Sequence, residues 1–491
     1  MNRHPNSMTL PPLLDCLMNA DSNPSTSTNP STSTIPSTDP PAAENGPPAA
    51  LAEIRIDAER IKNEVLELAE IGRDAESRGI YRMAFTDADM AGKRWLADRI
   101  EQAGLELRID GAGNVCGLLP GDSESDATAE RRQGPRLLVG SHTDTVPCAG
   151  ALDGALGVLV ALESLRRMRE VGYRPPFSIE LISFSDEEGR FGGMFGSEAV
   201  SGRLTLQRLR SAADLDGIRL WDAMQRVGLD PIAALDAQRD PNDLIGYLEL
   251  HIEQGPVLDA SRTPIGVVKD ITGLFKWAVT LSGEANHAGT TPMDMRRDAF
   301  MGLADFAHEI PRILAENGSP MSRATIGRAQ ILPGSANTVP GLVEFSLDVR
   351  DISEEVLREL SLACRRALSA IARRRELKFD FEQQSWIVPV ACDPAMTAHL
   401  EAAAGSLGLN YLVMPSGAAH DAQILGGVTP IAMLFVPSRE GQSHSPAEWT
   451  NWHDIEAGAN VFLQSLLRMS QPASPTHSPP PSDRQERSPQ T

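Results

Sequence analysis

The glycine-rich segment Gly140–Gly157 gathers side chains of the types that bind metal ions. It carries His142, Asp144 and Asp153, and it follows directly on the apolar run Leu137-Leu-Val. Imidazole and carboxylate groups without a thiolate are the usual ligands of catalytic zinc, manganese or cobalt ions. One segment supplies only part of a ligand set, so we expect other segments of the chain to complete it.

Three later segments carry the missing ligand types. They read Phe184-Ser-Asp-Glu-Glu-Gly, Leu250-His-Ile-Glu-Gln-Gly and Gly441-Gln-Ser-His-Ser-Pro-Ala-Glu. Together with the first segment they provide five candidate metal ligands, which are His142, Asp153, Glu188, His251 and His444. Five protein ligands exceed what one tetrahedral ion needs, and they would suit two ions about 3.5 Å apart if Asp153 bridges them.

The positions of three histidines distinguish them from the others. His142, His251 and His444 each follow an apolar run, where a strand is expected to give way to a loop. Ligand sites in open α/β sheets gather at the carboxyl ends of strands. Other histidines, such as His308 and His399, lie in helix-like sequence and are expected to be structural or to lie on the surface.

Length, charge and cysteine content restrict the class of protein. A chain of 491 residues favours two or three domains, and its net charge of -21 argues against a nucleic-acid partner, whose phosphates it would repel. No run of about 18 apolar residues is present to span a membrane. Five scattered cysteines without a paired motif indicate a reducing cytoplasm. Cys148 is expected to be a small packing residue, with a ligand or redox role left open.

Both ends of the chain have a low-complexity composition. Residues 1–51 are rich in Ser, Thr, Pro and Asn, and residues 471–491 are rich in Ser, Pro and charged residues. Neither segment can bury enough apolar surface to fold. We therefore expect two disordered tails and a folded part over residues 52–470.

Helices and short apolar strands alternate through the folded part. The expected helices span residues 57–69, 87–103 and 157–169, and the expected strands span 106–110, 115–119, 137–140, 178–183 and 431–436. The third helix would pack the glycine-rich segment onto the sheet. This alternation is typical of an α/β protein with a mixed or parallel sheet.

The pattern changes to β-α-β-β-α-β between residues 270 and 384. The expected strands span 277–282, 324–331, 343–350 and 377–382, and the helices span 298–315 and 354–374. This order is that of a ferredoxin-like unit. Because His251 precedes it and His444 follows it, we interpret residues 267–384 as a domain inserted into a catalytic metal-binding domain of residues 52–266 and 385–470. The joints near Gly266 and Val388 would be hinges.

The motifs of the chain resemble those of metal-dependent amidohydrolases of the hydantoinase/carbamoylase type, within the zinc peptidase superfamily. This group includes N-carbamoyl-L-amino-acid hydrolases, allantoate amidohydrolases and ureidoglycolate amidohydrolases. The resemblance extends over residues 52–470 and rests on these motifs in order: Gly-Ser-His-x-Asp-x-Val-Pro, Asp-Gly-x-Leu-Gly-Val, Asp-Glu-Glu-Gly, His-Ile-Glu-Gln-Gly-Pro, Asn-His-Ala-Gly-Thr-Thr-Pro-Met, Asp-Val-Arg-Asp, His-Asp-Ala-Gln and Ser-His-x-Pro-x-Glu.

The resemblance implies an α/β fold with two domains and a two-metal centre. The phosphorylase/hydrolase-like catalytic domain would have a mixed sheet, and the inserted ferredoxin-like domain would serve as a lid and form a homodimer. Each subunit would hold two divalent metal ions, zinc, manganese or cobalt. One ion would be bound by His142, Asp153 and His251, and the other by Asp153, Glu188 and His444.

The resemblance also implies roles for further residues. Glu187 would be the general base that activates water, and Asp144 would fix the tautomer of His142. The substrate would be held by His287 of the partner subunit at the oxyanion, Gln254 at the ureido group, Arg350 at the carboxylate, and by Asn337 and His420. For Arg350 a salt bridge to Asp348 or Asp351 is the alternative, and for His420 it is a supporting role.

The expected reaction is hydrolysis of the carbamoyl C–N bond of an N-carbamoyl-L-amino acid, with release of ammonia, CO2 and the amino acid. Allantoate or ureidoglycolate is the alternative substrate, since Cys148-Ala149 and Ala419 depart from the family pattern near the expected pocket. A metal-dependent dipeptidase or deacylase is less favoured because of Gln254. A non-catalytic dimerisation scaffold would have no need for Glu187 beside a complete ligand set.

Overall fold

The computed structural model describes residues 49–122 and 134–471 of the chain. The two predicted disordered tails lie outside these ranges, apart from Ala49–Leu51 and Gln471. No helix within the described ranges has the length and apolar character needed to cross a membrane.

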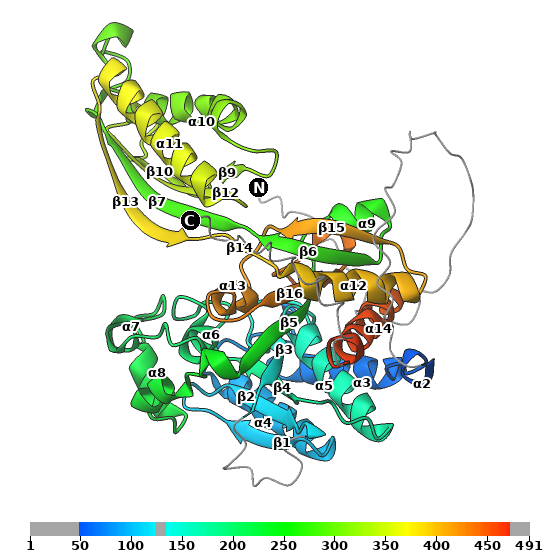
Figure 1. Ribbon diagram of the computed structural model, residues 1–491. Helices are drawn as coiled ribbons and strands as arrows, with labels where there is room; N and C mark the ends of the chain where they lie inside the picture. The colour runs from blue at the N-terminus through cyan, green and yellow to red at the C-terminus, as the bar shows by residue number, and fades with distance from the viewer. Residues whose placement is uncertain (1–48, 123–133, 472–491) are drawn as a thin grey trace, which may run out of the picture. The chain divides into compact units, whose positions relative to one another are not determined.

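A mixed sheet of nine strands forms the larger layer (Figure 1). Its order is β1-β2-β4-β3-β5-β16-β6-β14, and β15 also pairs with β6. The strands are β1 (Glu106–Ile109), β2 (Val115–Leu119), β3 (Arg136–His142), β4 (Ser178–Phe184), β5 (Leu244–Ile252), β6 (Ile265–Ile271), β14 (Val390–Ala391), β15 (Tyr411–Ser416) and β16 (Ile431–Val436). The predicted α/β class with a mixed sheet is confirmed.

Four parallel strands form the centre of this sheet. β3 pairs in parallel with β4 and β5, and β5 pairs in parallel with β16. All seven residues of β4 are buried, as expected of a strand covered on both faces. The carboxyl ends of these strands therefore meet at one edge, where β3 ends at His142 and β5 ends one residue after His251.

Helices cover the nine-stranded sheet. α5 packs against β3, β4 and β5, and α14 packs against β16 and α5. Thirteen residues of α5 are buried, which matches its apolar sequence. The helices of this part are α2 (Ala49–Ala52), α3 (Ala58–Glu70), α4 (Asp87–Gln102), α5 (Ala155–Glu170), α6 (Phe195–Val200), α7 (Leu206–Ser211), α8 (Leu220–Arg226), α9 (Val257–Ser261), α12 (Pro394–Ser406), α13 (Asp421–Leu425) and α14 (Trp452–Met469). Short 3-10 helices lie at Pro231–Ala237, Pro241–Asp243, Met293–Met295 and Arg439–Gly441.

A second sheet of five antiparallel strands lies between β6 and β14 in the chain (Figure 1). Its order is β10-β12-β7-β13, with β9 paired to β12. The strands are β7 (Gly273–Ser282), β9 (Arg323–Thr325), β10 (Ala329–Leu332), β12 (Leu342–Asp351) and β13 (Lys378–Ile387), and the helices are α10 (Ala299–Asn317) and α11 (Glu354–Arg374). A separate two-stranded ladder joins β8 (Asn286–His287) to β11 (Thr338–Val339).

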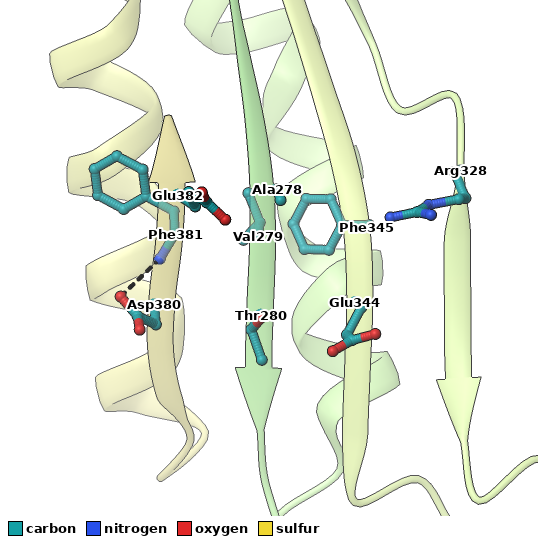
Figure 2. Close-up of a pocket in the computed structure, with 9 residues that line it drawn as sticks. All are labelled: Ala278, Val279, Thr280, Arg328, Glu344, Phe345, Asp380, Phe381 and Glu382. Carbon is teal, nitrogen blue, oxygen red and sulfur yellow. Dashed lines mark hydrogen bonds between the residues drawn. The ribbon is translucent and has the colours of Figure 1, made fainter. Parts of the chain in front are cut away.

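The two faces of the second sheet differ in polarity. Alternate residues of β7 and β12, such as Trp277 and Phe345, are buried in a core that also contains residues of α10 and α11. The side chains between them point to the opposite face. A pocket of about 320 Å³ in this sheet is lined by the nine residues that Figure 2 draws, which are Ala278, Val279, Thr280, Arg328, Glu344, Phe345, Asp380, Phe381 and Glu382. None of these nine is a predicted site residue.

The predicted elements differ from the observed ones mainly at their ends. The strands at residues 115–119 and 431–436 are found as predicted, whereas β3 continues for two residues beyond the predicted end at Gly140. The predicted strand 324–331 is wrong as a single element, because the chain forms β9 and β10 with a break at residues 326–328. Gly327 lies in that break, where the lack of a side chain weakens a strand.

Candidate metal centre

Three imidazoles converge on the carboxylate of Asp153. The Nε2 atoms of His251 and His142 lie 3.2 Å and 3.8 Å from Asp153 Oδ1, and Nε2 of His444 lies 3.4 Å from Asp153 Oδ2. His444 Nε2 also lies 3.4 Å from Glu188 Oε2. The structure thus brings all five predicted ligands into two groups that share Asp153, one with His142 and His251 and the other with Glu188 and His444.

The parallel strands place two of these imidazoles. His142 is the last residue of β3, and His251 stands on the neighbouring strand β5. Asp153 lies two residues before α5, and Gly154 between them has a φ of 62°. A Cβ at Gly154 would overlap the ring of His142, so only glycine fits this approach of the backbone to the imidazole.

Hydrogen bonds orient both strand histidines. Nδ1 of His142 donates to the backbone carbonyl of Asp144 at 3.0 Å, and Nδ1 of His251 donates to the carbonyl of Ile252 at 2.9 Å. A carbonyl can only accept, so Nδ1 carries the proton in each ring and a neutral ring presents the Nε2 lone pair to Asp153. A lone pair that faces a carboxylate needs a cation between them.

The pKa shifts show which groups are charged. Burial lowers the pKa of His142 to about 4, so its ring is neutral at pH 7. Burial opposes ionisation of Asp153, but hydrogen bonds with His251 and His444 outweigh it and hold its pKa well below the usual range. Burial likewise opposes protonation of His251, yet Asp153 raises the pKa of that ring to about 9. The ionised Asp153 therefore favours a cation at His251 Nε2, which can be a proton or a metal ion.

Unsatisfied atoms also fit a metal site. Glu188 Oε1 and Gln254 Oε1 are buried without a hydrogen-bond partner. A buried carboxylate oxygen without a donor costs free energy unless a cation binds it. The donor set, carboxylate and imidazole without thiolate, is suited to zinc, manganese or cobalt.

Glu187 stands beside this centre but in neither ligand group. Its Oε2 lies 3.5 Å from His142 Nε2. Burial, together with the negative charges of Asp421, Glu188 and Asp144, raises its pKa well above the usual range. Glu187 can therefore take up a proton at this position and hold it.

The carboxylate of Asp144 supports the turn that carries Glu187 and Glu188. Its Oδ1 accepts from the backbone N–H of Glu187 at 3.3 Å, and its Oδ2 accepts from that of Glu188 at 3.2 Å. The expected contact with His142 is made by the Asp144 backbone carbonyl, whereas Oδ1 is 3.9 Å from His142 Nδ1. The side chain thus positions Glu187 and Glu188, and its main chain orients His142.

Three residues of these segments have strained backbones. Asp186, Gln254 and His444 have φ values of 54°, 56° and 54°, in the left-handed region that side chains other than glycine rarely adopt. Such conformations cost free energy and cluster at functional sites.

Two of the predicted substrate contacts lie at the centre. Gln254 Nε2 donates to Asp153 Oδ2 at 2.7 Å and lies 3.4 Å from His444 Nε2. His420 is buried, its Nε2 is 2.9 Å from Ser416 Oγ, and its ring centroid is 4.6 Å from that of His251.

The other three predicted contacts lie on or beside the second sheet. Arg350 donates from Nε to Asp348 Oδ1 at 2.9 Å and from Nη1 to the carbonyl of Gly417 at 2.6 Å, so the alternative salt bridge to Asp348 is formed. His287 and Asn337 belong to or adjoin the β8–β11 ladder. Within the described residues, no hydrogen bond or ion pair joins these three side chains to the five candidate metal ligands.

Sequence reasoning missed several residues of the site. Glu448 Oε1 accepts from the N–H groups of Leu152 and Asp153 at 2.9 Å and 3.0 Å, and Ser443 Oγ donates to Asp153 Oδ2 at 2.8 Å. Burial and the charge of Asp153 raise the pKa of Glu448 to about 7. Glu448 lies only four residues after the candidate ligand His444, and this spacing could have indicated that it belongs to the site.

Glu249 is a second omission. It forms a third ligand-like group with His251 and His420, and it accepts a hydrogen bond from Ser141 Oγ at 2.7 Å. Residues two apart in a strand point to the same face, and Glu249 precedes His251 by two.

Comparison with known proteins identifies the family. The model of Peptidase family M20/M25/M40 matches residues 138–468. The chain belongs to this family. Members of the M20 family depend on metal ions, which agrees with the donor groups around Asp153.

Relatives of this M20 member are amidohydrolases. The chain is 38% identical to an N-carbamoyl-L-amino acid amidohydrolase of Geobacillus stearothermophilus, over 85% of this chain and 99% of the relative. It is 34% identical to an allantoate amidohydrolase of Bacillus subtilis, over 84% and 98%. A solved amidase of the hydantoinase/carbamoylase family from Burkholderia multivorans superimposes with a TM-score of 0.77 at 36% identity, covering 85% of this chain and 99% of that one.

Proposed function

We propose that this protein is a metal-dependent amidohydrolase that cleaves the carbamoyl C–N bond of an N-carbamoyl-L-amino acid. The products would be ammonia, CO2 and the amino acid. The observation that carries the proposal is the convergence of three imidazole Nε2 atoms on both oxygens of Asp153, with Glu187 beside them. Relatives named for this activity match 83–85% of the chain at 33–38% identity.

Two divalent ions, zinc, manganese or cobalt, account best for the donor groups. Asp153 would bridge them, with His142 and His251 on one ion and Glu188 and His444 on the other. When bound, such ions lower the pKa of a coordinated water towards about 7 and polarise the substrate carbonyl.

Glu187 would act as the general base. Its raised pKa suits a group that accepts the proton of the attacking water and then returns it to the leaving nitrogen. The amide N–H of Glu187 is bound to Asp144, which keeps the base in place during both transfers.

Gln254 and His420 would orient the substrate at the metal-ligand cluster. Gln254 Oε1 lacks a donor, and a ureido N–H group could supply one. Arg350 would bind the substrate carboxylate with its planar group of donors. This requires the guanidinium to exchange part of its contact with Asp348 for the substrate.

We also propose that residues 267–384 form an inserted ferredoxin-like domain that serves as a lid and dimerises. The order of its sheet supports the ferredoxin-like fold, because β12 and β7 pair at the centre while β10 and β13 lie at the two ends, as in a split β-α-β unit. Residues 52–266 and 385–470 would then be the catalytic domain.

Exposed apolar side chains support a homodimer through this domain. Met293, Met295, Phe300 and Ile331 are 38–74% exposed, and β10 is an edge strand. Exposed apolar residues and unpaired strand edges are features of protein interfaces. His287, near these methionines in the chain, could then act in the site of the partner subunit. A cytoplasmic location agrees with the free state of Cys116, Cys148, Cys364 and Cys392.

A panel of substrates tests this function. The metal-free protein would be supplied in turn with zinc, manganese or cobalt and assayed for ammonia from N-carbamoyl-L-amino acids, their D-enantiomers, allantoate and ureidoglycolate. We expect the N-carbamoyl-L-amino acids to be turned over fastest. The allantoate amidohydrolase of Bacillus subtilis among the relatives makes allantoate the second candidate. Rapid cleavage of dipeptides with all ureido acids inert would refute the proposal.

A further inference from the structure

A buried lysine stands behind the Glu187–Glu188 turn. Lys93 on α4 is 3% exposed, and its Nζ donates to Ser185 Oγ at 2.7 Å. The same Nζ lies 3.3 Å from Asp89 Oδ2, and Asp89 is fully buried. Nζ also stands 4.9 Å from the centroid of the Phe85 ring.

Burying this ammonium group costs free energy, and a role in positioning the site would explain why it is present. An ammonium group loses its hydration when it is buried, and a buried ion pair is often no more stable than an apolar pair of the same volume. Lys93 directs its charge to the carboxyl end of β4, where the chain turns towards Glu187 and Glu188. The pair with Asp89 alone would not require a donor to Ser185.

Ser185 is the first residue after β4 and is held at three atoms, one of which is its carbonyl oxygen, which accepts from the backbone N–H of Gly196 at 2.8 Å. The backbone N–H of Ser185 donates to Asn114 Oδ1 at 3.0 Å, and its hydroxyl accepts from Lys93. The next residue, Asp186, has a φ of 54°, and Asp144 then accepts from the N–H groups of Glu187 and Glu188. The strained turn is thus fixed at its start by Lys93 and Asn114 and at its end by Asp144.

We propose that Lys93 is a positioning residue that sets the Glu187–Glu188 turn through Ser185. The proposal rests on the proposed function, in which Glu187 is the base and Glu188 a metal ligand. Loss of the Lys93–Ser185 contact should loosen both groups at once, so that metal affinity and kcat fall together while the KM for the substrate changes little.

Three variants separate this role from a structural one. Lys93→Met removes the ammonium but leaves Asp89 unpaired, which by itself destabilises the fold. The double variant Asp89→Asn/Lys93→Met removes both charges, and Ser185→Ala removes only the acceptor. Arg239→Met is the matched control, because it breaks a buried ion pair with Glu180 in the sheet.

Metal affinity would be measured by titrating the metal-free full-length proteins with Co2+ and following its visible absorption, beside kcat and KM. We expect Ser185→Ala and the double variant to bind Co2+ about 10–100-fold more weakly, which is the usual loss when a residue that orients a metal ligand is removed. The value of kcat should fall by a similar factor. Arg239→Met should lower the unfolding temperature while its Co2+ affinity and its kcat per folded molecule stay at the wild-type values.

Wild-type Co2+ affinity and kcat in the double variant would overturn the proposal, since Lys93 would then only neutralise Asp89. Unchanged values in Ser185→Ala would overturn it as well. If the wild-type protein hydrolyses no substrate of the panel, the proposed function fails, whereas the Co2+ titration still decides whether Lys93 positions the turn.

Discussion

The neighbouring residues Glu187 and Glu188 allow a sharp test of the site, because their proposed roles differ although both are buried carboxyl groups. Glu188 belongs to a ligand group with Asp153 and His444, and Glu187 belongs to none. Replacing each with glutamine keeps the volume and the backbone N–H that donates to Asp144. Glu187→Gln should therefore abolish proton transfer and retain metal, while Glu188→Gln should weaken metal binding.

The expected size of the effect follows from the loss of a general base. A positioned base contributes about 10²–10⁴-fold to the rate, which corresponds to about 3–5 kcal/mol of transition-state free energy. Glutamine cannot take a proton from water at any pH of the assay. The loss in Glu187→Gln should thus be at least 100-fold in kcat, with little change in KM.

The assay combines metal analysis with single-substrate kinetics. Both variants would be loaded with the metal that best activates the wild-type protein, dialysed, and analysed for bound metal and for ammonia release. Activity of Glu187→Gln within about tenfold of the wild type, at full metal content, would refute its role as base. Loss of metal from Glu187→Gln but not from Glu188→Gln would show that the two roles are exchanged.

Three further predictions concern the backbone, pH and metal. Gly154→Ala should destabilise the fold by more than about 1 kcal/mol and prevent metal binding, because φ is 62° and the new Cβ would overlap the His142 ring. Thermal unfolding measures the loss of stability, and metal analysis measures the loss of binding. Glu180 is buried, which opposes ionisation, but Arg239 and Arg136 keep its pKa below the usual 4.5. The ionised Glu180 therefore stabilises the folded state above pH 4.5, and this contribution is lost as the pH falls through the lowered pKa. The unfolding free energies of wild type and Glu180→Gln, measured by urea titration, should differ most above pH 4.5 and approach each other in acid, and a gap that widens in acid would contradict this. Removal of metal with a chelator should lower the unfolding temperature, since a ligand at 100 times its Kd stabilises the folded state by about 2.7 kcal/mol. An unchanged unfolding temperature would contradict a resident ion.

The clustering of the candidate ligands could be predicted from the sequence because each stands in a short local pattern. His142 and His251 follow apolar runs that became β3 and β5, and the structure places both at the carboxyl ends of parallel strands. Asp153 lies in a glycine-rich segment whose glycines are required by close approach to other groups. Residue type and neighbouring residues sufficed for these positions.

The supporting contacts could not be predicted, because they join residues that are far apart in the chain. Lys93 and Ser185 are separated by 92 residues, and Glu448 is separated from Asp153 by 295. In a helix such as α4, a lysine is expected to be solvated, and only the packing of α4 near β2 shows that this one is buried. The break between β9 and β10 was missed because the strand pattern of residues 324–331 continues across Gly327.

The contacts of Asp153 explain why these distant segments must fold together before catalysis is possible. Its two oxygens face three imidazoles from β3, β5 and the segment before α14, and Oδ2 also accepts hydrogen bonds from Gln254 and Ser443. A buried carboxylate such as Asp153 is stabilised by a cation beside it, whether a proton on His251 or a metal ion. His142 and His251 are fixed by strands and by carbonyl acceptors, whereas His444 is 50% exposed and has a strained backbone. The order of Glu188 and His444 therefore depends more on bound metal than the order of His142 and His251. In the proposed two-ion centre, the ion at His142 and His251 should bind more tightly than the ion at Glu188 and His444.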